Sequence, residues 1–113
     1  MIESTLISYL SGKTSAGANV FAEIQKNPSA KYIIVEKTGS TTEDRITTAT
    51  VAVMSYASSL LDAASLNEEV KAIMDQTPEL DDISSCKLNS DYNFTDPTSK
   101  QYRYQAVFQI THY

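Results

Sequence analysis

A nucleophile and a base of the kind that thiol enzymes use both occur late in the sequence. Cys86 is the single cysteine and His112 the single histidine. A thiol becomes a catalytic nucleophile when a base takes its proton and a third group orients that base. Both residues fall in predicted strands, so they could be neighbours in a sheet, but the sequence shows no third group and no recognisable oxyanion site. We therefore predict that the protein is not an enzyme, with Cys86 a small core residue and His112 solvated.

A short glycine-containing segment invites comparison with a phosphate-binding loop. Gly12, Lys13 and Thr14 match the end of that motif. The motif also needs a glycine five residues before Gly12, where this chain has Ile7, and a strand before the loop, where a helix is predicted. We interpret the segment as a surface loop and predict no nucleotide and no other cofactor.

Acidic side chains gather in one part of the chain. Seven acidic residues and one basic residue lie between Asp62 and Asp82, whereas the whole chain carries −5. The loop with Glu79, Asp81 and Asp82 lacks the ordered spacing and central glycine of a calcium loop. A solvated face or an interface charge is the favoured interpretation, and weak cation binding stays open. An acidic chain without a basic stripe argues against specific nucleic-acid binding.

The length and composition bound the architecture that must position these residues. The 113 residues are predicted to form a single domain, 1–113, and 42% of them are hydrophobic, as in globular proteins. No apolar run approaches a membrane span, and the first residues do not resemble a secretory signal. Since the lone cysteine cannot form an internal disulfide, a reducing cytoplasm is the simplest compartment.

The clearest helix is predicted over residues 59–75. Its charges fall off one stripe, Ser58 or Ser59 can cap its start, and Pro78 follows its end. The apolar stripe is expected to pack on a sheet through Leu60, Ala63, Ala64, Val70, Ile73 and Met74.

The remaining elements complete an α+β fold. A short helix is predicted over 3–10, and strands over 20–24, 32–35, 46–56, 83–94 and 101–112. The order is α-β-β-β-α-β-β, with a mainly antiparallel or mixed sheet and both helices packed on one face.

Two features favour contacts between molecules. The polar stretch from Lys37 to Arg45 is interpreted as an exposed connection that is long for a hairpin turn. Its candidate interface residues are Lys37, Gly39, Glu43, Asp44 and Arg45. The seven tyrosines exceed what a small core needs, and tyrosine is common at subunit interfaces, although core-edge positions would also explain them.

Three segments resemble a known family. They read KYIIVEKTGS at 31–40, TATVAVMSYA at 48–57 and SLLDAASLNEEVKAIM at 59–74. Together they resemble the tail terminator (tail completion, head–tail joining) proteins of prophages of Gram-positive bacteria. In that family a short helix, a strand ending in a polar loop, and a strand ending in a Tyr-Ala or similar pair precede a helix with an Ala-Leu-Val-Met stripe and a two-stranded hairpin.

The resemblance implies a structural role in the virion. Family members assemble as rings, typically hexamers, at the head-proximal end of the tail tube, where they stop tube growth and present a docking face to the head connector. It thus implies as partners further copies of the chain, the tail tube protein and a connector or neck protein. The protein would be made in the host cytoplasm and end in the tail or neck, with DNA only in passage and Glu79, Asp81 and Asp82 at the lumen or an interface. Another neck or minor capsid component, or a small ligand-binding α+β domain, remains an alternative.

Overall fold

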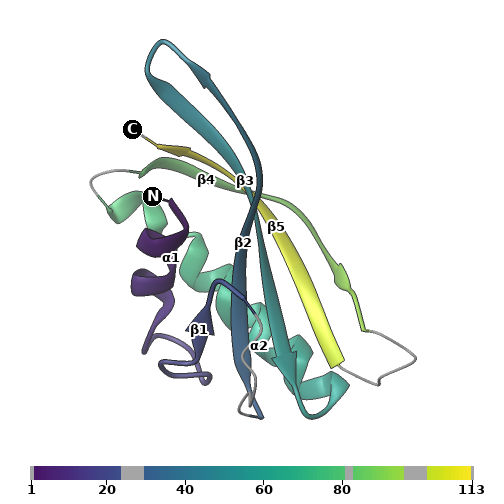
Figure 1. The fold of residues 1–113 in the computed structure, drawn as a ribbon. Coiled ribbons are helices and arrows are strands. Elements are labelled where there is room, and N and C mark those ends of the chain that lie inside the picture. The colour runs from purple at the N-terminus through teal and green to yellow at the C-terminus, as the bar shows by residue number, and fades with distance from the viewer. Residues whose placement is uncertain (1, 24–29, 81–82, 96–101, 113) are drawn as a thin grey trace.

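The fold is that of a computed structural model, which describes residues 2–23, 30–80, 83–95 and 102–112. The elements of these residues, in chain order, are α1 (Ile2–Leu10), β1 (Val20–Phe21), β2 (Tyr32–Glu43), β3 (Ile46–Ala57), α2 (Leu60–Met74), a 3-10 turn (Thr77–Glu79), β4 (Ile83–Asn93) and β5 (Tyr102–His112) (Figure 1). The predicted order α-β-β-β-α-β-β and the α+β class are confirmed.

The strands form one mixed sheet with the order β1-β2-β3-β5-β4 within the described residues. The short β1 pairs in parallel with Ile33 and Ile34 of β2, and every other neighbouring pair is antiparallel. β5 lies between β3 and β4, so the last strand in the chain is an interior strand of the sheet. β4 is an edge strand, and two register shifts along it disturb its pairing with β5.

The hydrophobic core lies between the two helices and one face of the sheet (Figure 1). Side chains on a strand alternate between faces, so every second residue of β3 and β5 points to the helices. On these two strands the buried members are Ala49, Val51, Val53, Ala106, Phe108 and Ile110. Leu6 and Leu10 of α1 pack into the same core. The prediction that both helices pack on one face is confirmed.

The second helix begins as predicted, but its buried face is rotated relative to the predicted apolar stripe. The Asp62 amide donates to Ser59 Oγ at 3.2 Å, so Ser59 is the N-cap. Leu60, expected in the core, is 41% exposed, while Leu66 and Asn67 are buried. The prediction for Leu60 is therefore wrong. Leu60 is the first residue of α2, where the chain leaves β3 and the side chain lies outside the core.

The stretch from Lys37 to Arg45 is exposed but is not the connection that was predicted. Strand β2 continues through it to Glu43, pairing with β3 up to the Glu43–Ile46 pair. The loop is reduced to Asp44 and Arg45, with φ values of 52° and 68°. Positive φ at both positions is the signature of a type I′ hairpin turn, which matches the twist of the flanking strands. Exposed polar side chains concealed this strand, because a strand solvated on both faces loses its apolar alternation.

The face of the sheet opposite the helices carries an aromatic row across β2, β3, β5 and β4. The rings of Tyr32 and Tyr56 stack at 4.5 Å between centroids. The guanidinium carbon of Arg103 lies 5.7 Å from the centroid of the Tyr56 ring and 4.4 Å from that of Phe94. Phe94 in turn meets the edge of Tyr92. Tyr32 and Tyr56 are buried and Tyr92 is exposed, so the tyrosines divide between core and surface.

Candidate functional site

The thiol and the imidazole do not face each other across the sheet. The register places Cys86 opposite Ile110 and His112 opposite Ile83. Burial raises the pKa of the half-buried Cys86 thiol, the charge of Asp75 adds to the rise, and a hydrogen bond with Thr77 opposes it. A thiol with a raised pKa is a poor nucleophile at neutral pH. The geometry therefore favours a packing role for Cys86.

The glycine-containing segment folds as a tight loop that uses its own amides. Gly12, at φ +79°, donates from N to the Gly17 carbonyl at 2.9 Å, and Gly17 N donates to the Thr14 carbonyl at 3.0 Å. A phosphate cradle needs such amides to point at the ligand. The Lys13 side chain lies over the Tyr9 ring, with its ammonium 5.0 Å from the ring centroid.

The acidic loop is only partly placed. Glu79 ends the 3-10 turn, whereas Asp81 and Asp82 lie outside the described residues. Among the residues that the structure does describe, no group of three or more histidine, cysteine, aspartate or glutamate side chains is arranged to hold a metal ion.

The candidate interface residues of the hairpin lie together at one end of the molecule. Lys37, Gly39 and Glu43 lie on β2, and Asp44 and Arg45 form the turn. All five are exposed, and Figure 1 shows the hairpin projecting past the helices at the top of the view. The structure brings these five residues together on one projecting hairpin.

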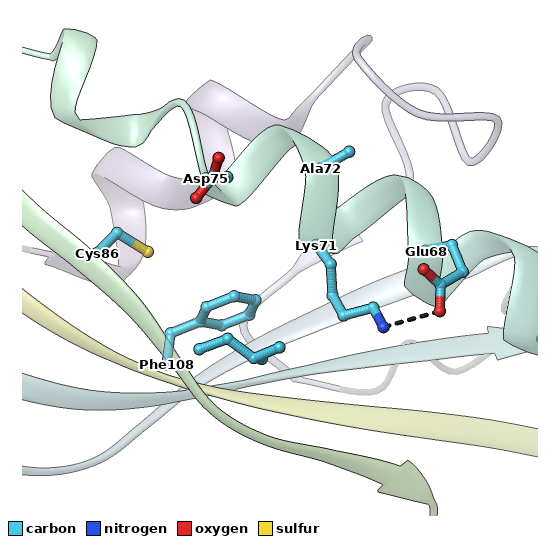
Figure 2. Close-up of a pocket in the computed structure, with 7 residues that line it drawn as sticks. Glu68, Lys71, Ala72, Asp75, Cys86 and Phe108 are labelled. Carbon is cyan, nitrogen blue, oxygen red and sulfur yellow. Dashed lines mark ion pairs between the residues drawn. The ribbon is translucent and has the colours of Figure 1, made fainter.

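A cleft lies between α2 and strands β4 and β5, and sequence reasoning missed it. It has a volume of about 390 Å³ and is lined by Glu68, Lys71, Ala72, Asp75, Cys86, Leu88 and Phe108 (Figure 2). We call it the acidic cleft. Phe108 and Leu88 give the cleft an apolar part of its lining, and Leu88 has 48% of its surface in solvent.

A charged network closes one side of the acidic cleft. Lys71 Nζ lies 2.7 Å from Glu68 Oε1 and 2.7 Å from Asp91 Oδ2. The buried Asn67 also donates to Asp91 Oδ2, at 3.3 Å. Hydrogen bonds with Asp91 and then Glu68 raise the pKa of Lys71. Two carboxylates thus neutralise the one lysine, and Asp75 remains on the opposite rim, so the cleft is net negative.

The sequence could not place this cleft, because its walls are distant along the chain. Lys71 and Asp91 are 20 residues apart, and only the β4–β5 register reveals that Asp91 faces the helix. The one sequence signal was the concentration of acids between Asp62 and Asp82, of which Glu68 and Asp75 line the cleft.

The chemistry available in the acidic cleft is recognition. Its lysine is held by two carboxylates, its thiol is kept protonated by burial, and part of its lining consists of aliphatic and aromatic carbon. An apolar lining with an acidic rim suits a long cationic side chain, whose methylenes pack on carbon while the charge reaches the carboxylates.

Comparisons with models of known protein families and with curated proteins find no match for this chain. Within its described residues, no helix is long and apolar enough to cross a membrane.

Proposed function

We propose that this protein is a structural subunit of a phage tail, which forms a ring at the head-proximal end of the tail tube. The observation that carries the proposal is the agreement between the order of elements and the pattern of the family that the sequence resembles. A short helix precedes the exposed β2–β3 hairpin, β3 ends in Tyr56-Ala57 shortly before α2, and the β4–β5 hairpin follows. In this role the ring ends tube growth and forms the docking face for the head connector.

The distribution of surface features supports an assembly role. The β2–β3 hairpin projects at one end, the acidic cleft opens beside α2, and the aromatic row lies on the face without helices. A ring built from one kind of subunit needs two different surfaces that fit each other, because each subunit is both donor and acceptor. A chain with several distinct exposed surfaces is suited to that use.

The charge of the protein fits passage of DNA without binding. The chain carries −5, with its acids concentrated on and after α2. An acidic lining repels the phosphate backbone and lets DNA slide. The proposed partners are other copies of the chain, the tail tube protein and the connector or neck protein.

The experiment that tests the proposal is tail assembly in a phage that lacks this gene. We expect overlong tubes or tails that fail to join heads, both reversed by supplying the protein. Tails of normal length that join heads efficiently without the protein would contradict it. A block at the portal or connector, with tails normal, would instead assign the chain to another neck or minor capsid position.

A second candidate function, a small ligand-binding domain, is favoured by the acidic cleft itself. Its volume lies within the range of small-molecule sites, about 300–1,000 Å³. A phage that assembles normal tails without the gene, together with a protein that stays monomeric at all concentrations and gains thermal stability from a cationic amphiphile, would favour this candidate.

A further inference from the structure

We propose that the acidic cleft of one subunit receives the Lys13 side chain of a second copy, so that Lys13 and the cleft form the repeated contact of the ring. The inference rests on the proposed function and names the surfaces that carry out its assembly step. The donor surface, here called the basic corner, consists of Tyr9, Lys13 and Lys31.

The acidic cleft has the features that a lysine side chain requires. Phe108 and Leu88 offer carbon for the methylenes of the side chain, while Asp75 stands on the rim for its ammonium (Figure 2). The lysine already in the cleft leaves Asp75 available, because Asp91 and Glu68 hold its ammonium at 2.7 Å each.

The basic corner presents the complementary chemistry. Lys13 is exposed, and its ammonium lies over the Tyr9 ring, 5.0 Å from the centroid. Lys31 adds a second cation beside the loop, since its Nζ donates to Ser15 Oγ at 3.2 Å. A positive charge over an aromatic ring therefore lies on the surface of a tight loop that Gly12 and Gly17 shape, and Lys31 is bound at the side of this loop.

The two surfaces lie on opposite flanks of α2. Ser15 of the loop donates from Oγ to Glu69 at 2.7 Å, whereas Lys71 faces the cleft and Asp91. Residues two apart on a helix point in directions that differ by about 200°. The basic corner and the acidic cleft therefore face away from each other, and neither can satisfy the other within one subunit.

This placement predicts how copies associate. A contact between two different patches on opposite flanks is heterologous, so each copy uses both patches and the contact repeats from copy to copy. The repeat ends in a ring when the rotation between neighbouring copies closes, as the proposed function requires. A contact that joined identical patches would stop at a dimer.

Disulfide trapping with the native cysteine tests the contact. Cys86 lines the acidic cleft, so Thr14→Cys, which keeps Lys13 and puts a thiol beside it, should place a second thiol near Cys86 in the neighbouring copy. We expect concentrated protein, oxidised with glutathione disulfide at mildly alkaline pH, to give a ladder of covalent dimers, trimers and larger species on a non-reducing gel. The ladder should end in a closed species whose size gives the number of subunits in the ring.

Three control variants give the ladder its meaning. Thr14→Cys with Cys86→Ser should stop at dimers, because each copy then has one thiol. Leu61→Cys, at the first turn of α2 with 77% of its surface exposed, should give far less cross-linking at the same concentration. Thr14→Cys with Ala72→Cys and Cys86→Ser moves the acceptor thiol to an exposed position in the cleft and should restore the ladder if burial slows Cys86. A ladder no faster than that of Leu61→Cys in both acceptor backgrounds, or a stop at dimers in both, would overturn the contact.

Charge exchange gives an independent readout in solution. Lys13→Glu and Asp75→Lys should each weaken self-association, measured by sedimentation, by about tenfold, the scale of one lost close ion pair. The double variant should recover most of the loss, because it restores opposite charges at every contact. Single losses without recovery would overturn the pairing of these residues.

The outcomes separate the contact from the function. Tube overgrowth in the gene deletion together with no ladder would leave the tail role standing and remove this contact. A ladder that closes, with normal tails in the gene deletion, would keep the contact and remove the tail role.

Discussion

At the residue scale, the charges of the acidic cleft show how a surface can be negative and still contain a lysine. Lys71 is held from two sides, by Glu68 on its own helix and by Asp91 on β4. Exposed ion pairs contribute little to stability individually. Their effect here is positional, because they fix the lysine against one wall and leave the carboxylate of Asp75 available on the rim.

The environment of Cys86 predicts its reactivity. Burial raises the thiol pKa above its ordinary value of 9.0, and Asp75 adds to the rise. The alkylation rate of folded protein should therefore have a midpoint above that pH, and Asp75→Asn should lower the midpoint by removing the added charge. The stability that the folded protein gains from holding this proton is fully present below the pKa of the unfolded thiol and is lost as pH rises through the folded pKa. A midpoint in folded protein at or below that in urea would contradict this account.

Val70 is a fully buried core position of α2. It is 0% exposed, so Val70→Asp buries an unpaired charge and should lower the free energy of unfolding by about 3 kcal/mol or more. The matched control is Leu61→Asp on the same helix, where 77% exposure predicts a change within about 0.5 kcal/mol. Urea denaturation of both variants measures the difference, and similar losses would mean that α2 packs by another face.

At the element scale, the turn of the β2–β3 hairpin contains residues that are not favoured for its backbone conformation. The turn is Asp44-Arg45, with both residues at positive φ, where Asn-Gly would be favoured. Arginine in the left-handed region costs roughly 1–2 kcal/mol, because its Cβ approaches the following carbonyl. The hairpin is held instead by its long register with β3.

The turn strain predicts a stabilising substitution. Arg45→Gly should raise the free energy of unfolding by about 1 kcal/mol, since glycine adopts positive φ at no steric cost. Arg45→Ala serves as the control for charge, because it removes the guanidinium and keeps the Cβ, and it should change little. Thermal unfolding that gives equal gains for both variants would assign the effect to charge.

The cap of α2 gives a second element-scale prediction. Ser59 Oγ accepts from the Asp62 amide, so Ser59→Ala should cost about 1 kcal/mol of stability. Ser58→Ala, one residue earlier, is the matched control and should be near neutral. A larger loss of stability for Ser58→Ala than for Ser59→Ala would indicate that Ser58, and not Ser59, caps the helix.

Much of the fold could be predicted from the sequence, because periodicity is a local property. The alternation in β5 identified the Ala106–Phe108–Ile110 face, and the helical period identified α2. The rotation of the α2 stripe to include Leu66 and Asn67, the extension of β2 to Glu43, and the acidic cleft could not be predicted. The cleft depends on a distant segment, β4, which lies opposite α2, and the extension of β2 depends on its pairing with β3 across the turn rather than on its own apolar pattern.

At the scale of the whole molecule, the part of the hairpin that extends outward is separate from the part of the chain that stabilises the fold. The side chains of the hairpin from Glu36 to Ile46 are exposed, and its paired backbone carries it past the helices (Figure 1). The tip therefore contributes little to the core, while its position at the far end of a molecule 44 Å long suits contact with another protein.

Shortening the hairpin tests this separation. Replacing residues 42–47 by Asn-Gly keeps the Thr41–Thr48 pair and rebuilds a two-residue turn. The free energy of unfolding should fall by no more than about 1 kcal/mol, whereas a phage carrying the change should join heads and tails poorly. Normal joining by the shortened protein would show that the tip makes no needed contact.

The position of β5 also determines when the protein can fold during synthesis. β5 lies between β3 and β4 in the sheet, and β4 pairs only with β5 among the described strands. A ribosome-bound chain that ends near Asn93 thus has β4 with no strand to join and a core that lacks Ala106, Phe108 and Ile110. Pairing between β3 and β5, which are far apart in the chain, is slow to form. Folding must wait until residues 102–112 have left the exit tunnel, so nascent chains on one message cannot assemble before then.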